Sequence, residues 1–405
     1  MARKADPDRP GLDALLASKE MIVVCGSGGT GKTTVSAALG AVAAQRLGAR
    51  VLVLTVDPAR RLATALGLTA LGNTEVRVDP ALLVDAEAAA GGLDGAAGHP
   101  VAGELWVAML DTKAGWDELI RRHAPDAALR DQVLANPLYQ NITGRFVHSH
   151  DYLAMERLHE VHASGRYDLV VIDTPPSRNA LELLDAPARM KEFFGSRLLR
   201  WLTVPYRSRL FTAASKPFYQ VADRVLGSRF LQDIAEFFIL FQTMEKGFVA
   251  RASEVERLLI DPRTSFVVVS TLEAAPAYEA GYLARELQRR RMNLGAIVLN
   301  RTLSADLRRP AAATAARKLR SAADDPDVVG RLAGLVDADP ASVRTVLVEV
   351  GERFHDVAVV ANREAERRAE LEEIGALTVT VPALTHDVAD LAGLLEIGGH
   401  LLGPR

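Results

Sequence analysis

The feature that most constrains the fold is an apolar run leading directly into a glycine-rich loop, residues 21–34 (Met-Ile-Val-Val-Cys-Gly-Ser-Gly-Gly-Thr-Gly-Lys-Thr-Thr). Gly26, Gly31, Lys32 and Thr33 match the spacing G-x-x-x-x-G-K-[ST], and the apolar run supplies the buried strand that such a loop follows. Glycines let backbone N–H groups surround phosphate oxygens, and the next helix presents its positive end to them. The segment therefore predicts a nucleotide-phosphate site. The simpler alternative, an ordinary glycine-rich turn, leaves the Lys-Thr pair unexplained.

Two side chains at the end of this loop have defined tasks in such a site. Lys32 is placed to reach the β and γ phosphates, and the Thr33 hydroxyl is placed to ligate Mg²⁺. The segment thus predicts a nucleotide with β and γ phosphates, together with Mg²⁺.

The composition excludes several classes of function. A net charge of −3 over 405 residues gives no general positive field, so no nucleic-acid partner is expected. The only cysteine is Cys25, which excludes a disulfide within the chain and any Cys-x-x-Cys zinc site. The N-terminal residues form no apolar signal-like run, and no uncharged apolar run approaches the roughly 18 residues of a membrane span. We therefore expect a cytoplasmic protein.

Apolar runs alternate with helical stretches along the chain, and 49% hydrophobic residues can build a large core. Residues 1–20 are expected to form a tail and a leading helix before one domain over 21–405. Further buried strands are predicted at 51–55, 105–110, 168–173, 266–270, 296–299 and 377–381. This order predicts the α/β class, with a doubly wound, mostly parallel sheet of about seven or eight strands. We expect a helical insertion over 186–260. A second helical excursion, over 303–375, is expected to consist of solvated helices packed beside the sheet.

Two aspartates follow predicted strands at their carboxyl ends, where ligands bind in open parallel sheets. Asp57 comes two residues after the strand at 51–55. Its simpler role is to cap a helix that begins at Pro58. Asp173 ends an apolar run, as does the aspartate that holds a Mg²⁺-bound water in phosphoryl-transfer sites. Both are predicted to lie at the ligand-binding edge.

The order of these motifs resembles the ArsA family of P-loop ATPases, which includes the arsenite-pump ATPase and the ATPase that delivers tail-anchored membrane proteins. The resemblance extends over residues 21–400. The matching segments are the deviant Walker A loop at 25–34, switch I at 56–62, switch II at 173–184, a glutamate at Glu273, and two adenine-binding segments at 299–301 and 381–384. MinD and ParA ATPases share the loop, but the Asp-Pro-Ala switch and the two late segments favour the ArsA branch.

The resemblance implies a Mg²⁺-dependent ATPase that hydrolyses ATP to ADP and phosphate and thereby switches a dimer. Lys32 and Asp57 would be catalytic, with Asp57 orienting the attacking water. Thr33 would ligate Mg²⁺, and Asp173 would support the metal through water. The residues expected to hold the phosphates are Gly28, Gly29, Thr30, Gly31, Lys32, Thr33 and Thr34. Asn300 would hydrogen-bond adenine, and Pro382 would pack against its ring.

The chain also departs from the family pattern. Ser27 stands where the family has a lysine that reaches the partner's nucleotide. Arg60, Arg61 or Arg178 could replace that charge, although solvated arginines are the simpler interpretation. Asn179 replaces the histidine of the targeting members in switch II. The missing cysteines argue against a thiolate site for arsenite.

Three functions stay open on these grounds. The first is an ATPase that switches a homodimer, or a heterodimer with a related ATPase, to handle an apolar cargo or a partner protein. The second is a nucleotide-gated scaffold with weak hydrolysis that acts with a related subunit. The third is the soluble ATPase subunit of an anion transporter.

The insertion is the expected place for a cargo. Nine of the twelve phenylalanines lie between residues 186 and 250. By the resemblance, this region could take an apolar helix, a lipid-like ligand or a membrane-protein partner. The alternative is a helical subdomain with its own core.

Overall fold

The computed structural model describes residues 11–56, 60–68, 71–89, 103–110, 112–124, 126–136, 139–140, 149–174, 184–185, 188–189, 191–192 and 245–403. Several predicted features fall outside these residues. They are the tail before residue 11, Asp57, the switch II residues Arg178 and Asn179, and most of the insertion.

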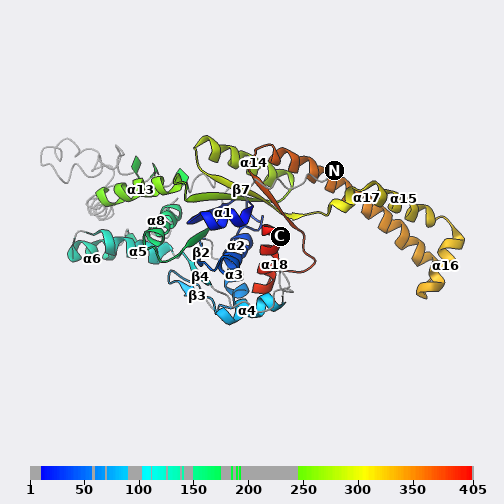
Figure 1. Ribbon diagram of the computed structural model, residues 1–405, viewed down its shortest axis with the longest axis horizontal. Coiled ribbons are helices and arrows are strands. Elements are labelled where there is room, and N and C mark those ends of the chain that lie inside the picture. Colours follow the sequence, from blue (N-terminus) through cyan, green and yellow to red (C-terminus); the bar gives the residue numbers. More distant parts are fainter. Residues whose placement is uncertain are drawn as a thin grey trace, which may run out of the picture.

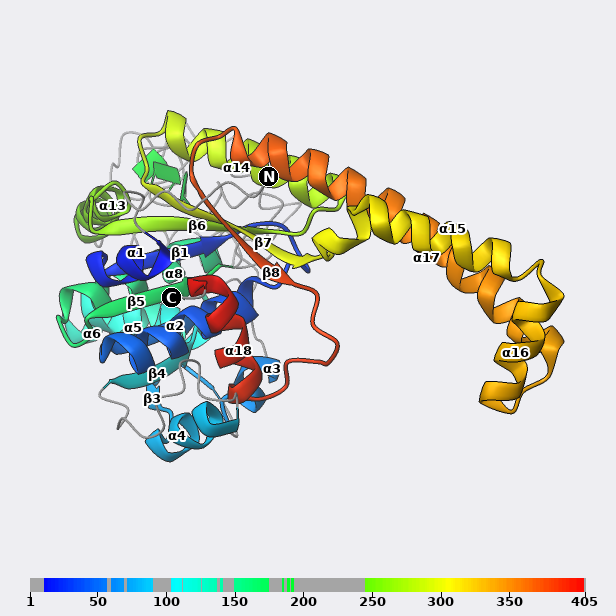
Figure 2. The same cartoon turned by 45° about the vertical axis from the view of Figure 1, so that its right-hand side comes forward.

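The core of the fold is an eight-stranded sheet in the order β3-β4-β2-β5-β1-β6-β7-β8 (Figure 2). The strands are β1 Met21–Cys25, β2 Arg50–Thr55, β3 Val76–Arg77, β4 Glu104–Met109, β5 Leu169–Asp173, β6 Thr264–Ser270, β7 Leu294–Thr302 and β8 Leu377–Pro382. Every neighbouring pair is parallel except β3 with β4. The predicted α/β class and mostly parallel sheet are confirmed. The two-residue antiparallel strand β3 was not expected.

Helices cover both faces of this sheet (Figure 2). One face is covered by α1 Leu12–Ser18, α2 Lys32–Leu47, α3 Arg60–Ala65, α4 Pro80–Ala89 and α18 Leu391–Leu402. The other is covered by α5 Thr112–His123, α6 Ala127–Ala135, α8 Ser149–Ala163, α13 Glu245–Leu259 and α14 Ala274–Arg289. The central strand β1 is buried throughout, and its side chains alternate between the two apolar clusters. Because both faces of β1 are buried, its sequence is a continuous apolar run rather than an alternation of apolar and polar residues.

Residues 303–375 form a helical arm, defined here as α15 Pro310–Ala322, α16 Pro326–Val336 and α17 Pro340–Glu372, preceded by a 3₁₀ turn at Ala305–Arg308. Contrary to the expectation that these helices pack beside the sheet, most of the arm projects away from it (Figures 1 and 2). The reason is length, because the 33 residues of α17 span roughly 50 Å. Only its C-terminal end returns to the core, through the buried Leu371.

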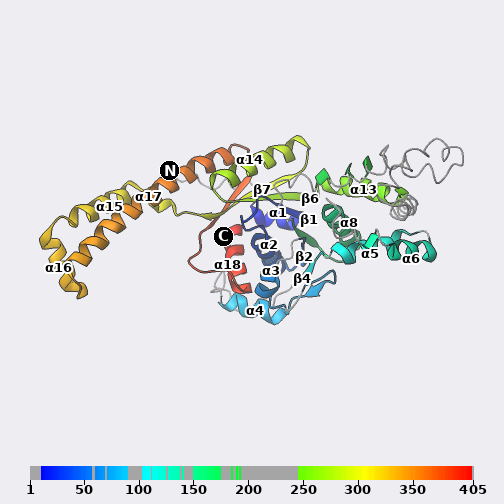
Figure 3. The ribbon, with the colours of Figure 1, turned by 180° about the vertical axis from the view of Figure 1, so that it is seen from behind.

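The arm and the α5, α6 and α13 helices lie at opposite ends of the molecule (Figure 3). None of the helices in the described part of the chain is both long enough and apolar enough to cross a membrane.

Cys25 ends β1 inside the core, and its burial predicts an unreactive thiol. Burial raises the pKa of the thiol to about 12, against a smaller opposing effect of Lys32. Because the thiolate is the nucleophile, the folded protein should not react with Ellman's reagent at pH 8. In denaturant the chain should release one equivalent of the chromophore, since it has one cysteine.

The same shift has a consequence for stability. The neutral thiol is favoured in the folded state, so its contribution is fully present below the unfolded pKa of 9.0. That contribution should decline as the pH rises from 9.0 towards about 12. Replacing Cys25 with alanine should remove the thiol signal in denaturant. Rapid labelling of the folded protein would contradict the predicted burial.

Candidate functional site

The candidate site lies where the carboxyl ends of three neighbouring strands meet. β5 lies between β2 and β1, and Asp173 pairs in register with Thr55 on one side and Val24 on the other. Asp173 and the residue after it are buried. The glycine-rich loop follows β1 at this same edge, so the parallel order of the strands brings Asp173 to the loop.

Glycines make the turn of the loop possible. Gly26, Gly29 and Gly31 all have positive φ angles, of 145°, 76° and 92°. A Cβ on Gly26 would lie 2.1 Å from the carbonyl oxygen of Val269, and one on Gly31 would lie 2.3 Å from Nδ2 of Asn300. A Cβ on Gly29 would meet nothing within 4 Å. Thus Gly26 and Gly31 fix the loop against β6 and β7, while Gly29 borders open space.

The lysine and threonine predicted from the motif begin α2. Lys32 is 5% exposed, and its Nζ donates a hydrogen bond of 2.8 Å to the carbonyl oxygen of Ser27 in the loop. Thr33 Oγ1 donates a hydrogen bond of 2.7 Å to Oδ2 of Asp173. Thr55 Oγ1, at the end of β2, donates to the same oxygen at 2.9 Å. The N-terminus of α2, a buried ammonium, a hydroxyl and a carboxylate therefore converge.

The rest of the predicted loop surrounds this point. Gly28 and Gly29 are exposed, and Thr34 is partly exposed in the first turn of α2. Thr30 is buried, and its hydroxyl donates to the carbonyl oxygen of Ser27 at 2.9 Å. The exposed glycine backbone offers a surface that faces outward, next to the buried lysine.

Ser27, at the position where the resemblance implies a lysine, has a partner that the sequence does not suggest. Its hydroxyl donates a short hydrogen bond to the carboxylate of Glu279 on α14. The two residues are 252 positions apart, so neither local pattern nor motif connects them. The contact places a carboxylate beside the loop.

Asn300 ties β7 to the loop. Its Nδ2 donates a hydrogen bond of 2.8 Å to the carbonyl oxygen of Thr30, and its Oδ1 accepts one of 3.0 Å from the backbone N–H of Arg301. Asn300 is buried. The structure thus brings this residue to the glycine-rich loop.

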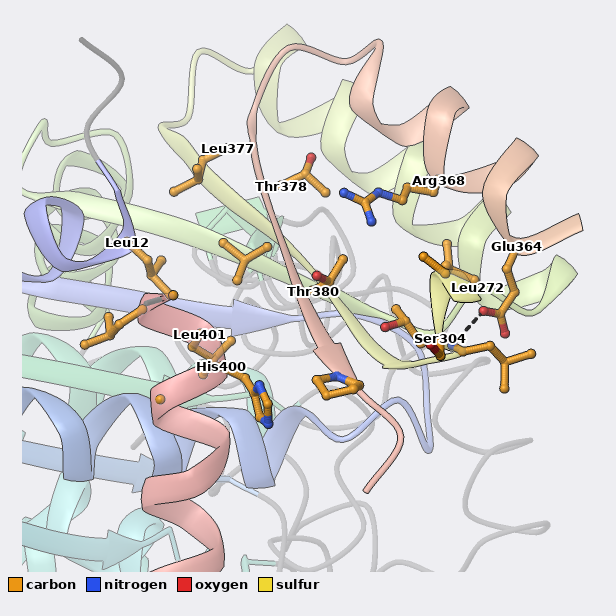
Figure 4. A pocket seen from close by; sticks show the side chains of 18 of the residues that line it. Leu12, Leu272, Ser304, Glu364, Arg368, Leu377, Thr378, Thr380, His400 and Leu401 are labelled. Atoms are coloured by element: carbon orange, nitrogen blue, oxygen red, sulfur yellow. Dashed lines mark hydrogen bonds between the residues drawn. The ribbon is translucent and has the colours of Figure 1, made fainter. Parts of the chain in front are cut away.

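Pro382 lies at the end of the edge strand β8, in register with Thr302 of β7. It lines an open cavity of about 810 Å³ that follows β8 and extends to His400 on α18 (Figure 4). Leu12 and Leu377 line the same cavity, and Arg368 and Glu364 of α17 approach it. Neither Asn300 nor Lys32 is among the lining residues. The two residues predicted to hold adenine therefore do not line this cavity together.

The oxygen atoms at the centre of the site are suited to Mg²⁺. A threonine hydroxyl and an aspartate carboxylate are hard ligands, and Mg²⁺ usually takes only one or two protein ligands together with phosphate oxygens and water. Within the described ranges there is no group of three or more His, Cys, Asp or Glu side chains that could hold a metal. The donor set fits a cation shared with phosphates better than one held by protein alone.

Sequence reasoning missed Thr55 and Glu279. Thr55 could have been found, because it ends a predicted strand two residues before Asp57 and therefore lies at the same edge. Glu279 could not, because it becomes adjacent to the loop only when α14 packs against the sheet.

Comparison with known proteins matches the chain to a protein family and to curated relatives, two of which are described here. A family model described as anion-transporting ATPase (ArsA_ATPase) matches residues 19–322. An uncharacterized protein of Streptomyces coelicolor is 29% identical over 245 residues, which cover 60% of this chain and 54% of that protein. The ATPase GET3 of Komagataella phaffii is 28% identical over 142 residues, which cover 35% of this chain and 36% of that protein.

The chain thus spans about half the length of one of these relatives and about a third of the other. The family match is broader, since it includes the loop, Asp173 and Asn300. With a nucleotide-type loop on a mostly parallel sheet and a family match over most of its length, the chain belongs to the ArsA family of anion-transporting ATPases.

Proposed function

We propose that this chain is a Mg²⁺-dependent ATPase that hydrolyses ATP to ADP and phosphate and uses the nucleotide state to switch a dimer. The observation that carries the proposal is the convergence of Lys32, Thr33 and Asp173 at the N-terminus of α2. Phosphoryl transfer depends mainly on positioning and on neutralising charge, and these groups can supply both. Family membership supports the same activity.

The bound phosphates would lie over the exposed glycine backbone. Lys32 would exchange the carbonyl oxygen of Ser27 for phosphate oxygens as the acceptors of its Nζ. The Thr33 hydroxyl would ligate Mg²⁺, and Asp173, which holds that hydroxyl at 2.7 Å, would orient it and accept from a metal-bound water. Mg²⁺ would neutralise charge that develops on the phosphates.

Further roles rest on the resemblance alone. Asp57 would orient the attacking water, Asn300 would hydrogen-bond adenine, and Pro382 would pack against its ring. Since Asn300 already bonds to the carbonyl oxygen of Thr30, adenine contact would add to a structural role.

An apolar helix, a lipid-like ligand or a membrane-protein partner is the cargo we propose for residues 186–250. Of the phenylalanines in this range, the structure describes Phe248, which is fully buried and packs 6.5 Å from the ring of Trp116. Phe248 therefore belongs to the hydrophobic core. A surface for cargo would have to be formed by the other phenylalanines of residues 186–250.

A nucleotide-gated scaffold with weak hydrolysis is a second candidate, favoured by the Ser27 contact. In place of a cation that could reach a partner's nucleotide, the loop presents a hydroxyl bound to the carboxylate of Glu279. Such a chain would depend on a related subunit for turnover. The soluble ATPase subunit of an anion transporter is a third candidate, and it is supported by the family description alone.

Steady-state Mg·ATP hydrolysis by the purified chain, beside Asp57→Asn, tests the proposal. We expect turnover in the unmutated chain and a loss of at least about a hundredfold in the variant, because the water loses its orienting group. Bound nucleotide, measured after rapid gel filtration, should be equal in both. Size measurement with ATP and with ADP reports whether a dimer forms.

The outcomes separate the candidates. Tight ATP binding without turnover in the unmutated chain would support the scaffold and contradict an autonomous ATPase. Equal turnover in the chain and in Asp57→Asn would contradict the role of Asp57.

A further inference from the structure

The helical arm exposes apolar side chains far from the candidate site. It projects beyond the sheet in all views of the ribbon (Figures 1–3). Its longest helix, α17, contacts α15 along one side and α16 near its start. The nucleotide chemistry gives no reason for the length or the surface of this arm.

One side of α17 packs inside the arm. Its inner residues are small or apolar and recur with helical spacing: Leu347, Gly351, Phe354, Ala358 and Ala361. Gly351 and Ala361 are fully buried, and the other three are partly buried. The absence of a side chain at Gly351 lets α15 approach, since a Cβ there would lie 2.4 Å from Arg320. This face needs no further partner.

A second side of α17 is apolar and open. Val346, Val350, Val357 and Val360 follow one another at spacings of four, seven and three residues, which places them on one helix face. Each is between 38% and 56% exposed. Arg353 interrupts this row, and its guanidinium pairs with Glu349. We call these four residues the valine stripe.

Helix α15 continues the apolar surface next to the stripe. Arg320 of α15 lies against Gly351, and Asp324, two residues beyond the end of α15, pairs with Arg344, so these charged side chains lie on the flank of α17 away from the valines. Leu319, on the opposite flank of α15, is therefore turned toward the valine side. It is 36% exposed. The open surface thus extends over two helices.

Carboxylates border the stripe on its outer side. Glu349 lies three residues after Val346 and Asp356 lies four before Val360, so both are next to the stripe, and Glu352 lies farther round the same side of the helix. Among the residues described, neither Glu352 nor Asp356 has an ion-pair partner. From Pro310 to Val360, a range that includes α15, the chain carries eight Asp or Glu and six Lys or Arg, an excess of two negative charges.

We propose that the valine stripe and its acidic border are a docking surface for a basic amphipathic helix of another protein. An exposed apolar row marks an interaction site, and the apolar face of a helix can lie along it. Lysine or arginine on the flank of that helix would meet Glu352 and Asp356, which would set its orientation and exclude acidic helices.

The charge argues against two other occupants. An anionic lipid surface would be repelled by the carboxylates of Glu352 and Asp356, which lie on the outer side of the stripe. In a second copy of this chain, the same acidic border would accompany the same stripe, so two stripes would meet with like charges at their edges. A basic partner satisfies both features of the surface.

Peptide binding to the full chain tests this proposal. The probe is a fluorescein-labelled helix of about five turns, roughly 18 residues, with leucine on one face and lysine on the other. A matched peptide carries glutamate in place of lysine. By fluorescence anisotropy, the basic peptide should bind the chain at least tenfold more tightly than the acidic one.

Variants locate the binding. The triple variant Val346→Ser, Val350→Ser, Val357→Ser should weaken the basic peptide at least tenfold, because it removes the apolar row from an exposed face. The double variant Glu352→Lys, Asp356→Lys should weaken the binding of the basic peptide, because its lysines would then meet positive charges. Val84→Ser, at a valine of α4 that is 47% exposed and lies outside the arm, should leave the binding of the basic peptide unchanged. Circular dichroism and ATP turnover should be unchanged in all of them.

Several results would overturn the proposal. These are no binding of the basic peptide, equal binding by the triple variant, or equal binding of the acidic peptide. Self-association of the chain that the triple variant abolishes would assign the surface to a second copy. Flotation with phosphatidylserine vesicles that the triple variant abolishes would assign it to a membrane.

Discussion

Replacing Asp173 with asparagine is expected to lower Mg·ATP turnover by about 10- to 100-fold while the protein still folds. One oxygen of this carboxylate accepts hydrogen bonds from Thr33 Oγ1 and Thr55 Oγ1, at 2.7 and 2.9 Å. An amide has only one acceptor oxygen and no negative charge. The variant would therefore hold the Thr33 hydroxyl less firmly and attract Mg²⁺ less strongly. The requirement for Mg²⁺ should shift to higher concentration.

A matched control lies near the other end of the same strand. Asp168 directly precedes β5 and accepts a hydrogen bond of 2.7 Å from the backbone N–H of Arg50 at the surface. Asp168→Asn should leave turnover and its Mg²⁺ dependence unchanged. The measurement is phosphate release against Mg²⁺ concentration, with thermal unfolding to verify the fold. If Asp173→Asn matched the unmutated chain at every Mg²⁺ concentration, Asp173 would have no part in the metal site.

The central strands and the loop could be predicted because their signals are local. The prediction of β1 and its loop rests on five apolar residues from Met21 to Cys25, all buried in the structure, followed by glycine, lysine and threonine at fixed spacing. It does not depend on contacts with distant parts of the chain. The helix after the loop, α2, ends at Leu47, and the glycine that caps it, Gly48, has a φ of 63°. Asp173 could be placed for the same reason, since the end of a parallel strand defines its position.

Features that depend on tertiary packing could not be predicted. Glu279 reaches Ser27 across 252 positions, and Asn300 reaches Thr30 across 270. The strand β3 has only two residues and pairs antiparallel with β4, so it is too short to show the alternation of apolar and polar residues that predicts a strand. The arm was expected to be helical, but the sequence pattern of a solvated helix does not determine whether the helix packs on the sheet or projects from it. The buried face of α17 depends on its packing against α15, which the sequence alone does not show.

Replacing Gly26 with alanine should lower the free energy of unfolding by about 2–5 kcal/mol, more than the same substitution at Gly29 of the same loop. The new Cβ would lie 2.1 Å from the carbonyl oxygen of Val269, a backbone atom of the buried strand β6 that cannot move away. The φ of 145° adds strain, because residues with a Cβ rarely adopt it. β1 and β6 pair directly beside this point, so relief would require them to separate.

Gly29→Ala is the matched control within the same loop. Its φ of 76° is also positive, yet a Cβ there meets nothing within 4 Å. Only the left-handed conformation is penalised, at about 1 kcal/mol. Urea unfolding followed by circular dichroism should therefore give a much lower midpoint for Gly26→Ala than for Gly29→Ala. Equal midpoints would mean that the approach of Gly26 to β6 does not constrain the loop. Both effects would then come from backbone conformation alone, and the close contact would carry no energy.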